Sequence, residues 1–309
     1  MKIDGKDILQ EYNCILLDGS LGEVLKYPKR KTVQYNDWAE ADGIQPDISE
    51  VEFEPRHIRL SLFFNYGSKS GFLAIYRRLI AGLTAPGYRK VTVIDGFIME
   101  LRLNETTGFN VPRIIDEGEN HVAFTLDFIE DNNSILGVPY PVDGINLRGH
   151  CSINDIDFGA FGAGFDEAPG EILKYPDMKE PFTDGKSVYL STINTRHREI
   201  RIRLWMLASN KDIFLNNHRA LFGQLASPGL QDLYFNATGD TIPVYYSECT
   251  EFNIGKWSES GVAARFSISL IAPIASWIEA GGSSYVKLLL DDDRMLYISD
   301  EDGKLLEVK

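Results

Sequence analysis

Apolar and polar residues alternate along two widely separated segments of the chain. In Glu199–Met206 (EIRIRLWM) the even-numbered positions from 200 to 204 are apolar, and arginines stand between them. His57–Phe64 (HIRLSLFF) alternates at first and then becomes wholly apolar. A period of two with one apolar face is typical of a β-strand that covers a core, so both segments are predicted to be strands.

A segment of helical period follows each of these predicted strands. In Phe72–Leu83 apolar residues recur three and four positions apart, and Ala85-Pro86-Gly87 then ends the pattern. The same stripe runs through Phe214–Leu225 and ends at Ser227-Pro228-Gly229. Proline and glycine directly after such a stripe mark a helix end, so the chain is predicted to contain two amphipathic helices.

Further strand-like segments follow each helix, and Asp95-Gly96 provides a hairpin turn between the first two. They are Arg89–Ile94, Phe97–Leu103 and His121–Ile129 after the first helix, and Leu233–Asn236, Ile242–Glu248 and Ala263–Ile271 after the second. The predicted fold class is therefore mainly β (α+β), with two tandem β-sandwich or open-barrel domains that each carry one flanking helix. Beyond Ala280–Ser284 (AGGSS), short apolar segments predict a small C-terminal β-hairpin on a flexible hinge.

A short polar string occurs twice in the chain. Gly22–Pro28 reads GEVLKYP and Gly170–Pro176 reads GEILKYP, and seven of the ten positions from 22 to 31 are identical in 170 to 179. The helical segments match as well, at seven of sixteen positions between Phe72–Gly87 and Phe214–Gly229. Internal matches that keep their order predict a duplicated domain. Matched residues are 148 positions apart in the first match and 142 positions apart in the second. About six residues are therefore missing from the second copy between the two matches.

These matches divide the chain into a first domain at 1–131, a linker at 132–152 rich in Asn, Gly and Pro, a second domain at 153–277 and a hairpin extension at 278–309. Each domain is long enough to bury a core of its own. Thr32–Glu50 lies between two predicted strands and has Asp42-Gly43 near its centre. We expect it to form a long hairpin arm, in the region that is shorter in the second copy.

Charge and cysteine content narrow the class of protein. The 309 residues carry a formal net charge of −14, which disfavours a protein that coats nucleic acid, because neutralising phosphate requires an excess of Lys and Arg. Cys14, Cys151 and Cys249 cannot form a closed disulfide framework and are expected to be buried thiols. The N-terminus has no apolar signal segment and no apolar run reaches membrane-spanning length, so we expect a cytoplasmic protein without membrane contact.

Catalytic and metal-binding patterns are weak. Arg56-His57 and Arg196-His197 lie near the same predicted strand of the two copies, but they are two residues out of register and have no nucleophile nearby. The acidic runs Asp291–Asp293 and Asp300–Asp302 lack the ligand spacing of a calcium loop, and the five histidines have no metal-type spacing. The protein is therefore predicted not to be an enzyme and to have no catalytic, cofactor or metal site.

Two groups of residues are candidates for structural or interface roles. The repeated string is predicted to anchor a turn onto the core through Leu25, Tyr27, Pro28, Leu173, Tyr175 and Pro176. Arg77 and Arg219 occupy the same position of the two helices, and each is predicted to pair with a carboxylate within its unit rather than across a subunit boundary. Since aromatic and arginine side chains dominate interface energetics, the candidate interface residues are Tyr35, Trp38, Ile44, Arg201 and Arg203.

The arrangement resembles the tail-tube fold of bacteriophages and related injection systems, of the distal-tail or baseplate-hub type. The resemblance rests on a β-sandwich with one flanking helix, a long hairpin arm, the tandem repeat, and the similar openings Ile3–Asp7 and Ile153–Asp157. It implies a structural, ring-forming component of a tail or baseplate. Such a protein assembles in the cytoplasm, is located in the virion tail, lines a channel for DNA passage and joins the tail tube to the tip.

Two tube-like units in one chain imply a six-unit ring made by three chains, with a hexamer as the other assembly. The partners would be further copies of the chain and other tail or baseplate proteins, and DNA would pass without specific contact. The alternative function is a carbohydrate-binding adhesion module with duplicated β-sandwich domains. Such a module would carry a repeated aromatic platform, and Trp38, Trp205, Trp257 and Trp277 do not align between the copies.

Overall fold

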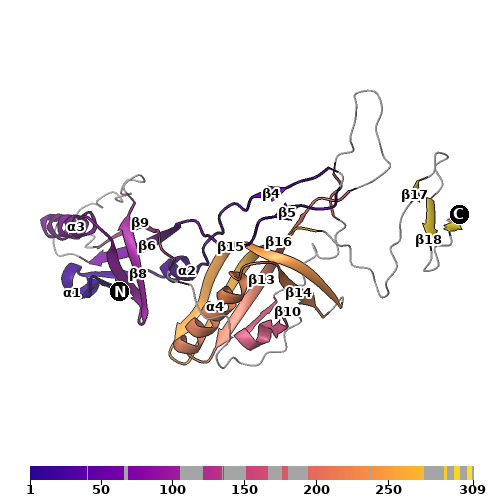
Figure 1. Ribbon diagram of the computed structural model, residues 1–309. Helices are drawn as coiled ribbons and strands as arrows, with labels where there is room; N and C mark the ends of the chain where they lie inside the picture. Colours follow the sequence, from indigo (N-terminus) through magenta and orange to yellow (C-terminus); the bar gives the residue numbers. More distant parts are fainter. Residues whose placement is uncertain are drawn as a thin grey trace.

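The computed structural model describes residues 1–39, 41–65, 69–104, 121–133, 135, 151–165, 176–179, 194–236, 239–274, 289–290, 296–299 and 305–307. Its elements include two seven-stranded sheets, each accompanied by one helix of 15 residues. Figure 1 shows the two sheets next to each other, with a hairpin from the first passing over the second. The predicted mainly β fold class is confirmed.

The first unit is the sheet of order β2-β1-β7-β8-β9-β6-β3 together with helices α1, α2 and α3. Its elements are β1 (Lys2–Ile3), β2 (Lys6–Asp7), α1 (Ile8–Tyr12), β3 (Cys14–Leu16), α2 (Ser20–Leu25), β6 (Arg56–Asn65), α3 (Lys69–Leu83), β7 (Arg89–Ile94), β8 (Phe97–Leu103) and β9 (His121–Glu130). Between α2 and β6 the chain forms a hairpin of two paired strands, β4 (Tyr35–Asn36) and β5 (Gln45–Pro46). The hairpin predicted for Thr32–Glu50 is therefore confirmed, and we call this segment the arm.

The second unit is the sheet of order β11-β10-β14-β15-β16-β13-β12 with η1 and α4, and this order repeats that of the first unit. Its elements are β10 (Cys151–Ile153), β11 (Ile156–Asp157), the 3₁₀ helix η1 (Phe158–Phe161), β12 (Ala163–Phe165), β13 (Arg198–Ala208), α4 (Lys211–Leu225), β14 (Gln231–Phe235), β15 (Asp240–Ser258) and β16 (Gly261–Ala272). The register of the paired central strands is also the same in the two units. Arg56 of β6 lies opposite Glu130 of β9, and Arg198 of β13 lies opposite Ala272 of β16, a shift of 142 residues on both strands.

Alternating burial explains why the central strands lie where they do. Every second residue of β6 and β13 is buried, as the alternation of the sequence predicted, and the arginines between them on β13 face outward. α4 begins where the Asn210 side chain accepts a hydrogen bond from the N–H of Ile213, and it ends three residues before Pro228. The predicted helices and central strands are thus confirmed.

Short helices and the C-terminal extension differ from the expectation. One helix in each unit was predicted, and α1, α2 and η1 are additional, because helices of four to six residues are too short to show a helical period. β10 begins at Cys151, two residues before the expected start of the second domain. The extension contains three strands in one sheet, where a hairpin was expected: β17 (Leu289–Leu290), β18 (Leu296–Ser299) and β19 (Leu305–Glu307). Most of the predicted linker lies outside the described residues.

The cysteines are free and buried, as expected. Burial raises the pKa of the Cys14 and Cys249 thiols to about 12 and also raises the pKa of Cys151, so all three remain protonated at neutral pH. No helix in the described part of the chain combines the length and the apolar character that crossing a membrane requires.

Candidate functional site: the contact between the two units

The segment that follows β3 leaves its own sheet and packs against the second unit. α2 contacts β6 of the first unit on one side and β15 of the second unit on the other. A Cβ atom on Gly22 would overlap the carbonyl oxygen of Phe252 in β15, so the close approach of these two elements requires glycine. The approach brings the residues after Gly22 onto the helix and sheet of the second unit.

Tyr27 is the centre of this contact. Its side chain is 2% exposed, and its ring stacks on His218 and Phe222 of α4 with centroid distances of 4.5 and 4.8 Å. The rings of Phe252 and Phe266 meet it edge-on at 6.2 and 5.8 Å. The hydroxyl donates to the carbonyl oxygen of His218 at 2.9 Å, which satisfies the one polar group that burial removes from water.

His218 binds the first unit as well. Its Nε2 lies 2.8 Å from the carbonyl oxygen of Leu25, and because a carbonyl only accepts, the ring hydrogen is on Nε2. Burial lowers the pKa of His218 to about 3; the bond to Leu25 opposes this shift, and the charges of Arg56 and Arg219 add to it. The imidazole is therefore neutral at physiological pH and donates to the end of α2.

A buried ion pair holds α2 from the side of the first unit. Arg56 Nε donates to Glu130 Oε2 at 2.6 Å, and the two side chains are 6% and 0% exposed. Arg56 Nη1 also donates to the carbonyl oxygens of Val24 and Lys26 at 2.9 and 2.8 Å. Carbonyl groups at the end of a helix lack partners within the helix, so these bonds fix the point at which the chain turns toward the second unit.

Beyond Pro28 the chain runs along β15. Tyr246 donates its hydroxyl to the carbonyl oxygen of Pro28 at 2.9 Å, and the N–H of Arg30 donates to the carbonyl oxygen of Ser247 at 2.8 Å. The guanidinium of Arg30 lies 5.3 Å from the centroid of the Tyr245 ring. The contact with the second unit is therefore continuous from Gly22 to Arg30.

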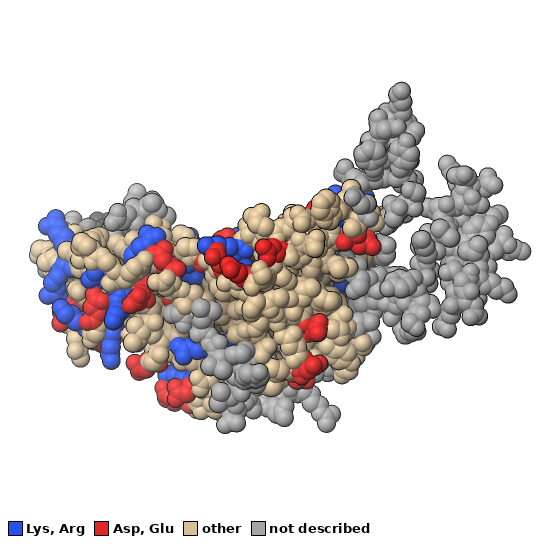
Figure 2. Space-filling model, viewed as in Figure 1, with Lys and Arg blue, Asp and Glu red and all other residues tan. Residues whose placement is uncertain are grey.

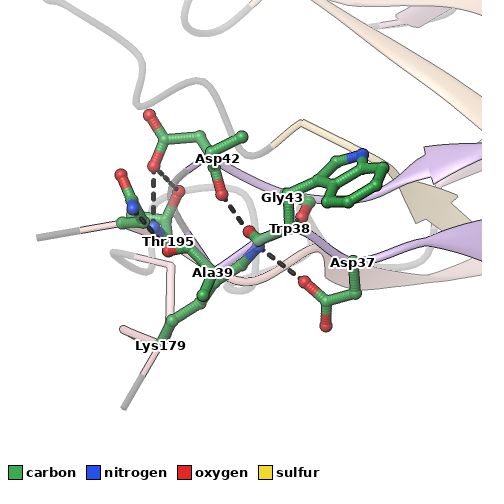
Figure 3. A network of polar contacts seen from close by, with 9 residues as sticks. Asp37, Trp38, Ala39, Asp42, Gly43, Lys179 and Thr195 are labelled. Atoms are coloured by element: carbon green, nitrogen blue, oxygen red, sulfur yellow. Dashed lines mark hydrogen bonds and ion pairs between the residues drawn. The ribbon is translucent and has the colours of Figure 1, made fainter. Parts of the chain in front are cut away.

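Lys179 of the second unit holds the tip of the arm. Its side chain is 9% exposed, and Nζ lies 2.6 Å from Asp37 Oδ1. Nζ also donates to the carbonyl oxygens of Trp38, Ala41 and Gly43, at 2.7, 2.8 and 2.8 Å. A desolvated ammonium group is stable only when it is paired and hydrogen-bonded, and this part of the arm provides both kinds of partner (Figure 3).

Asp42 and Gly43 complete the attachment of the arm. Asp42 Oδ1 accepts from the N–H and the hydroxyl of Thr195 at 2.7 and 2.9 Å (Figure 3). The N–H of Gly43 donates to the Thr195 carbonyl, and the N–H of Ile44 donates to the Pro273 carbonyl, both at 2.8 Å. Gly43 has a φ of +67°, and a Cβ atom there would overlap the Pro273 oxygen, so glycine is required on both counts.

The residues of the repeated string divide between described and undescribed parts of the chain. The described residues of the first string are buried: Leu25, Tyr27 and Pro28. They pack against the core of the second unit as well as that of the first. Pro176 is buried too, whereas Leu173 and Tyr175 lie outside the described residues.

The other candidate residues lie in varied surroundings. The guanidinium of Arg219 lies 5.1 Å from the centroid of the Phe97 ring in the first unit, a cation–π contact across the units, and Arg77 is exposed. Their pairing with carboxylates stays a prediction. Ile44 is 6% exposed, and the remaining candidate interface residues are exposed: Tyr35, Trp38, Arg201 and Arg203. Their interface role also stays a prediction.

The sequence did not single out His218, Arg56 or Lys179 as site residues, although each carries several contacts of this interface. For Lys179 and Arg56, the alignment of the two copies provides a sequence signal. Lys179 aligns with Lys31 in the repeated string, and Arg56 aligns with Arg198 when the strands are matched by their alternation. His218 occupies a position of an apolar helical stripe, which gives no indication of its partner.

The described residues line hollows beside the second unit. One of about 450 Å³ lies between the units, beside Met1, Lys2 and Asp95 on one side and Asn210, Trp257 and Glu259 on the other. Another, of about 500 Å³, lies beside Trp205, Leu207, Asn253 and Arg265. Within the described ranges, no group of three or more His, Cys, Asp or Glu side chains is placed to hold a metal ion.

No known protein family matches the chain, and no curated protein matches it in sequence. Among solved structures the chain is similar to the SPP1 Dit protein, described as a paradigm of the hub adsorption apparatus in phages that infect Gram-positive bacteria. The sequences are 10% identical, and the comparison covers 87% of this chain and 96% of that chain with a TM-score of 0.28. At this TM-score the similarity supports no conclusion about function.

Proposed function

We propose that the chain is a structural, ring-forming component of a phage tail or of a phage-derived injection machine, built from two copies of one tube-like domain. The observation that carries the proposal is the contact between two units of equal topology through different surfaces. The first unit contributes the α2 segment with Tyr27, and the second contributes α4 with His218 and Phe222. Such a contact is heterologous, because the two partners do not use the same patch.

Heterologous contacts between equivalent units generate a ring when their rotation closes. Three chains of two units each would supply six units, and a ring would also cover sheet edges that otherwise invite unwanted pairing. In the assembled virion tail such a ring would contact other tail or baseplate proteins above and below.

The charge of the chain suits a channel through which DNA passes without being held. The formal net charge is −14, and on the face shown in Figure 2 the described Lys and Arg side chains form no continuous basic surface. Most charged side chains on this face lie over the first unit, among Asp and Glu, and the surface over the second unit is largely uncharged. Surfaces of this kind favour passage of a polyanion over binding.

The oligomeric state tests the proposal. Light scattering after size exclusion, across a concentration series, should give the mass of a trimer or a hexamer of the 34.8 kDa chain. Negative-stain images of the same fraction should show closed rings with a central channel. A monomer at every concentration, with no rings in the images, would contradict the proposal.

The alternative function, carbohydrate binding, has one supporting observation. The hollow beside Trp205 combines an aromatic side chain with Asn253 and Arg265, and apolar walls with a few polar groups are typical of small-molecule sites. Glycan-array binding that is lost in Asn253→Ala, in a chain that remains monomeric, would favour this alternative over the ring.

A further inference from the structure

We propose that Trp38, on the arm of one chain, inserts into the hollow beside Trp205 on the second unit of another copy of the chain. Through this contact, rings of the proposed assembly would stack end to end. The stacking rests on the proposed ring, whereas the contact itself joins any two chains.

The arm presents Trp38 on a rigid support. Lys179 binds Asp37 and the carbonyl oxygen of Gly43, and Thr195 accepts from the N–H of Gly43, so the main chain is held on both sides of Trp38. In this network Trp38 takes part through its carbonyl oxygen. Its side chain is 54% exposed, and the ring points away from Lys179 (Figure 3). An exposed aromatic ring on a fixed main chain loses little conformational freedom on binding, which suits an anchor residue.

The hollow beside Trp205 has the size and the walls to receive such a ring. Its volume is about 500 Å³, within the range of small-molecule pockets. Trp205 is fixed in place, because its Nε1 donates to the carbonyl oxygen of Phe165 at 3.0 Å and its ring occupies the space of a side chain at Gly164. Leu207 also lines the hollow and is 37% exposed, and the small residue Ala263 lies opposite it on β16. An incoming indole would therefore meet a preformed aromatic and apolar wall.

Charge favours a second copy of the chain as the occupant. The arm tip, Asp37–Asp42, reads DWAEAD, so three acidic residues lie within four positions of Trp38, and Lys179 offsets one of them. Among the described residues that line the hollow, Arg265 carries the one charge. An acidic tip and a basic hollow attract each other, although two chains of net charge −14 otherwise repel.

A chain cannot place Trp38 in its own hollow. The arm tip is bound to Thr195 and Pro273, just beyond one end of the β13–β16 strand pair. The hollow lies toward the other end, where Leu207 pairs with Ala263. From the start of β13 to Leu207 the strand covers nine steps of about 3.3 Å each, or roughly 30 Å. Because tip and hollow lie at opposite ends of one strand pair, each chain can give one tip and receive one, and successive chains stack head to tail.

The residues that suit the hollow to this tip are specific to the second unit. With the shift of 142 residues between the paired strands, Leu207 corresponds to Asn65 and Arg265 corresponds to Ala123. The apolar wall and the positive charge are therefore not repeated at these positions of the first unit. Each chain thus offers one such hollow for the one arm of its first unit.

A single contact of this kind is too small to join two chains permanently. A buried tryptophan contributes about 150–250 Å², whereas each partner in a stable interface buries about 800 Å². Between two rings of three chains the contact would occur three times, and linked weak contacts gain affinity through multivalency. Stacking is therefore expected at high concentration or between assembled rings.

Chemical cross-linking of the full chain tests the contact. Ala39→Cys places a thiol beside Trp38, and Glu251→Cys places one at the rim of the hollow, two residues before Asn253; both positions are exposed. The native cysteines are buried, so they do not react in the folded chain. With a short bismaleimide the double variant should give a ladder of covalent multimers on a denaturing gel, because each chain then links to two others.

Substitutions on the two surfaces show whether the ladder reports this contact. Within the double variant, Trp38→Ala and Leu207→Asp should each lower the rate of cross-linking at least about 30-fold, the effect of removing a central anchor, with an unchanged circular dichroism spectrum. Tyr234→Ala, at an aromatic residue of β14 that is 37% exposed, is the matched control and should leave the ladder intact. Leu207→Ser replaces Leu207→Asp if the aspartate disturbs folding.

The outcomes separate this inference from the proposed function. No ladder, or a ladder that Trp38→Ala leaves intact, overturns the docking, and rings of the wild-type chain would then still stand. A wild-type chain that is monomeric in light scattering, with a ladder that depends on Trp38 and Leu207, would support the contact without the ring. Glycan binding that is lost in Leu207→Asp, in a chain that gives no ladder, would assign the hollow to a sugar and overturn the inference.

Discussion

At the scale of single residues, the contact between the units depends on a histidine that stays neutral. His218 is fully buried, and a proton on its ring would join the positive charges of Arg56 and Arg219. Its pKa in the folded chain is about 3, against an ordinary value of 6.5. Between these two pH values the unfolded chain binds a proton that the folded chain does not bind, so stability falls as the pH is lowered through this window.

We therefore expect the free energy of unfolding to decrease from pH 6.5 toward pH 3, with this residue contributing up to about 1.4 kcal/mol per pH unit. Urea unfolding at several pH values between 7 and 4 measures the slope. His218→Gln keeps a hydrogen-bond donor and cannot titrate, so its slope should be smaller than that of the wild type. Equal slopes in the wild type and His218→Gln would assign the acid sensitivity to other groups.

At the scale of elements, two helical glycines should respond to alanine in opposite directions. In α2, a Cβ atom at Gly22 would overlap the main chain of β15, and neither element can move without losing the Tyr27 pocket. In α3, a Cβ atom at Gly82 would have only the Tyr12 hydroxyl near it, at 3.8 Å. The first substitution adds volume to a closed contact, and the second improves helix propensity at an open position.

Gly22→Ala should thus lower the free energy of unfolding by about 1–3 kcal/mol, and Gly82→Ala should raise it by up to about 1 kcal/mol. Chemical denaturation of the two variants beside the wild type measures both changes. If Gly22→Ala were as stable as the wild type, α2 would not lie against β15 as described.

The sequence predicted α3, α4, β6 and β13 well because their periods extend over enough residues, whereas β15, the longest described strand, was expected only over Ile242–Glu248. α3 and α4 each combine an apolar stripe with a proline-glycine end, and apolar residues occupy every second position over Ile58–Leu62 of β6 and Ile200–Leu204 of β13. α1 and α2 have five and six residues, and their caps are local hydrogen bonds or main-chain conformations rather than a pattern. Such elements are fixed by tertiary contacts, which a single sequence does not display.

The sequence predicted one side of the contact between the units but not the other. The repeat identified Tyr27 as structurally important, because an aromatic residue retained in a polar string indicates packing. It could not identify the partner, since His218 lies 191 residues away and its helix position is the same whether it faces its own sheet or another unit. Lys179 and Asp37 are likewise 142 residues apart, and a charged side chain gives no sequence signal for a partner at that distance.

At the scale of the whole molecule, the two units share one apolar core. The buried side chains of both sheets form a single contiguous cluster that includes Tyr27. The arm adds a second attachment through Lys179 and Thr195, on the far side of the second unit from α2 (Figure 1). Two attachments with a common core make the relative position of the units a property of the folded chain, and a ring built from such pairs would inherit that geometry.

Cooperativity of unfolding tests this coupling, and Tyr27 is the residue to change. Calorimetry of the wild-type chain should show one transition, because exposing either unit also exposes the pocket of the other. Tyr27→Ala removes an aromatic side chain that is 2% exposed and should cost about 3–5 kcal/mol, as for other buried aromatic truncations. Because the substitution weakens the contact that links the two units, the variant should unfold in two resolved transitions. Tyr35→Ala, at a tyrosine that is 50% exposed, should change stability by less than about 0.5 kcal/mol and keep a single transition. One unshifted transition in Tyr27→Ala would mean that the units are coupled by the arm alone.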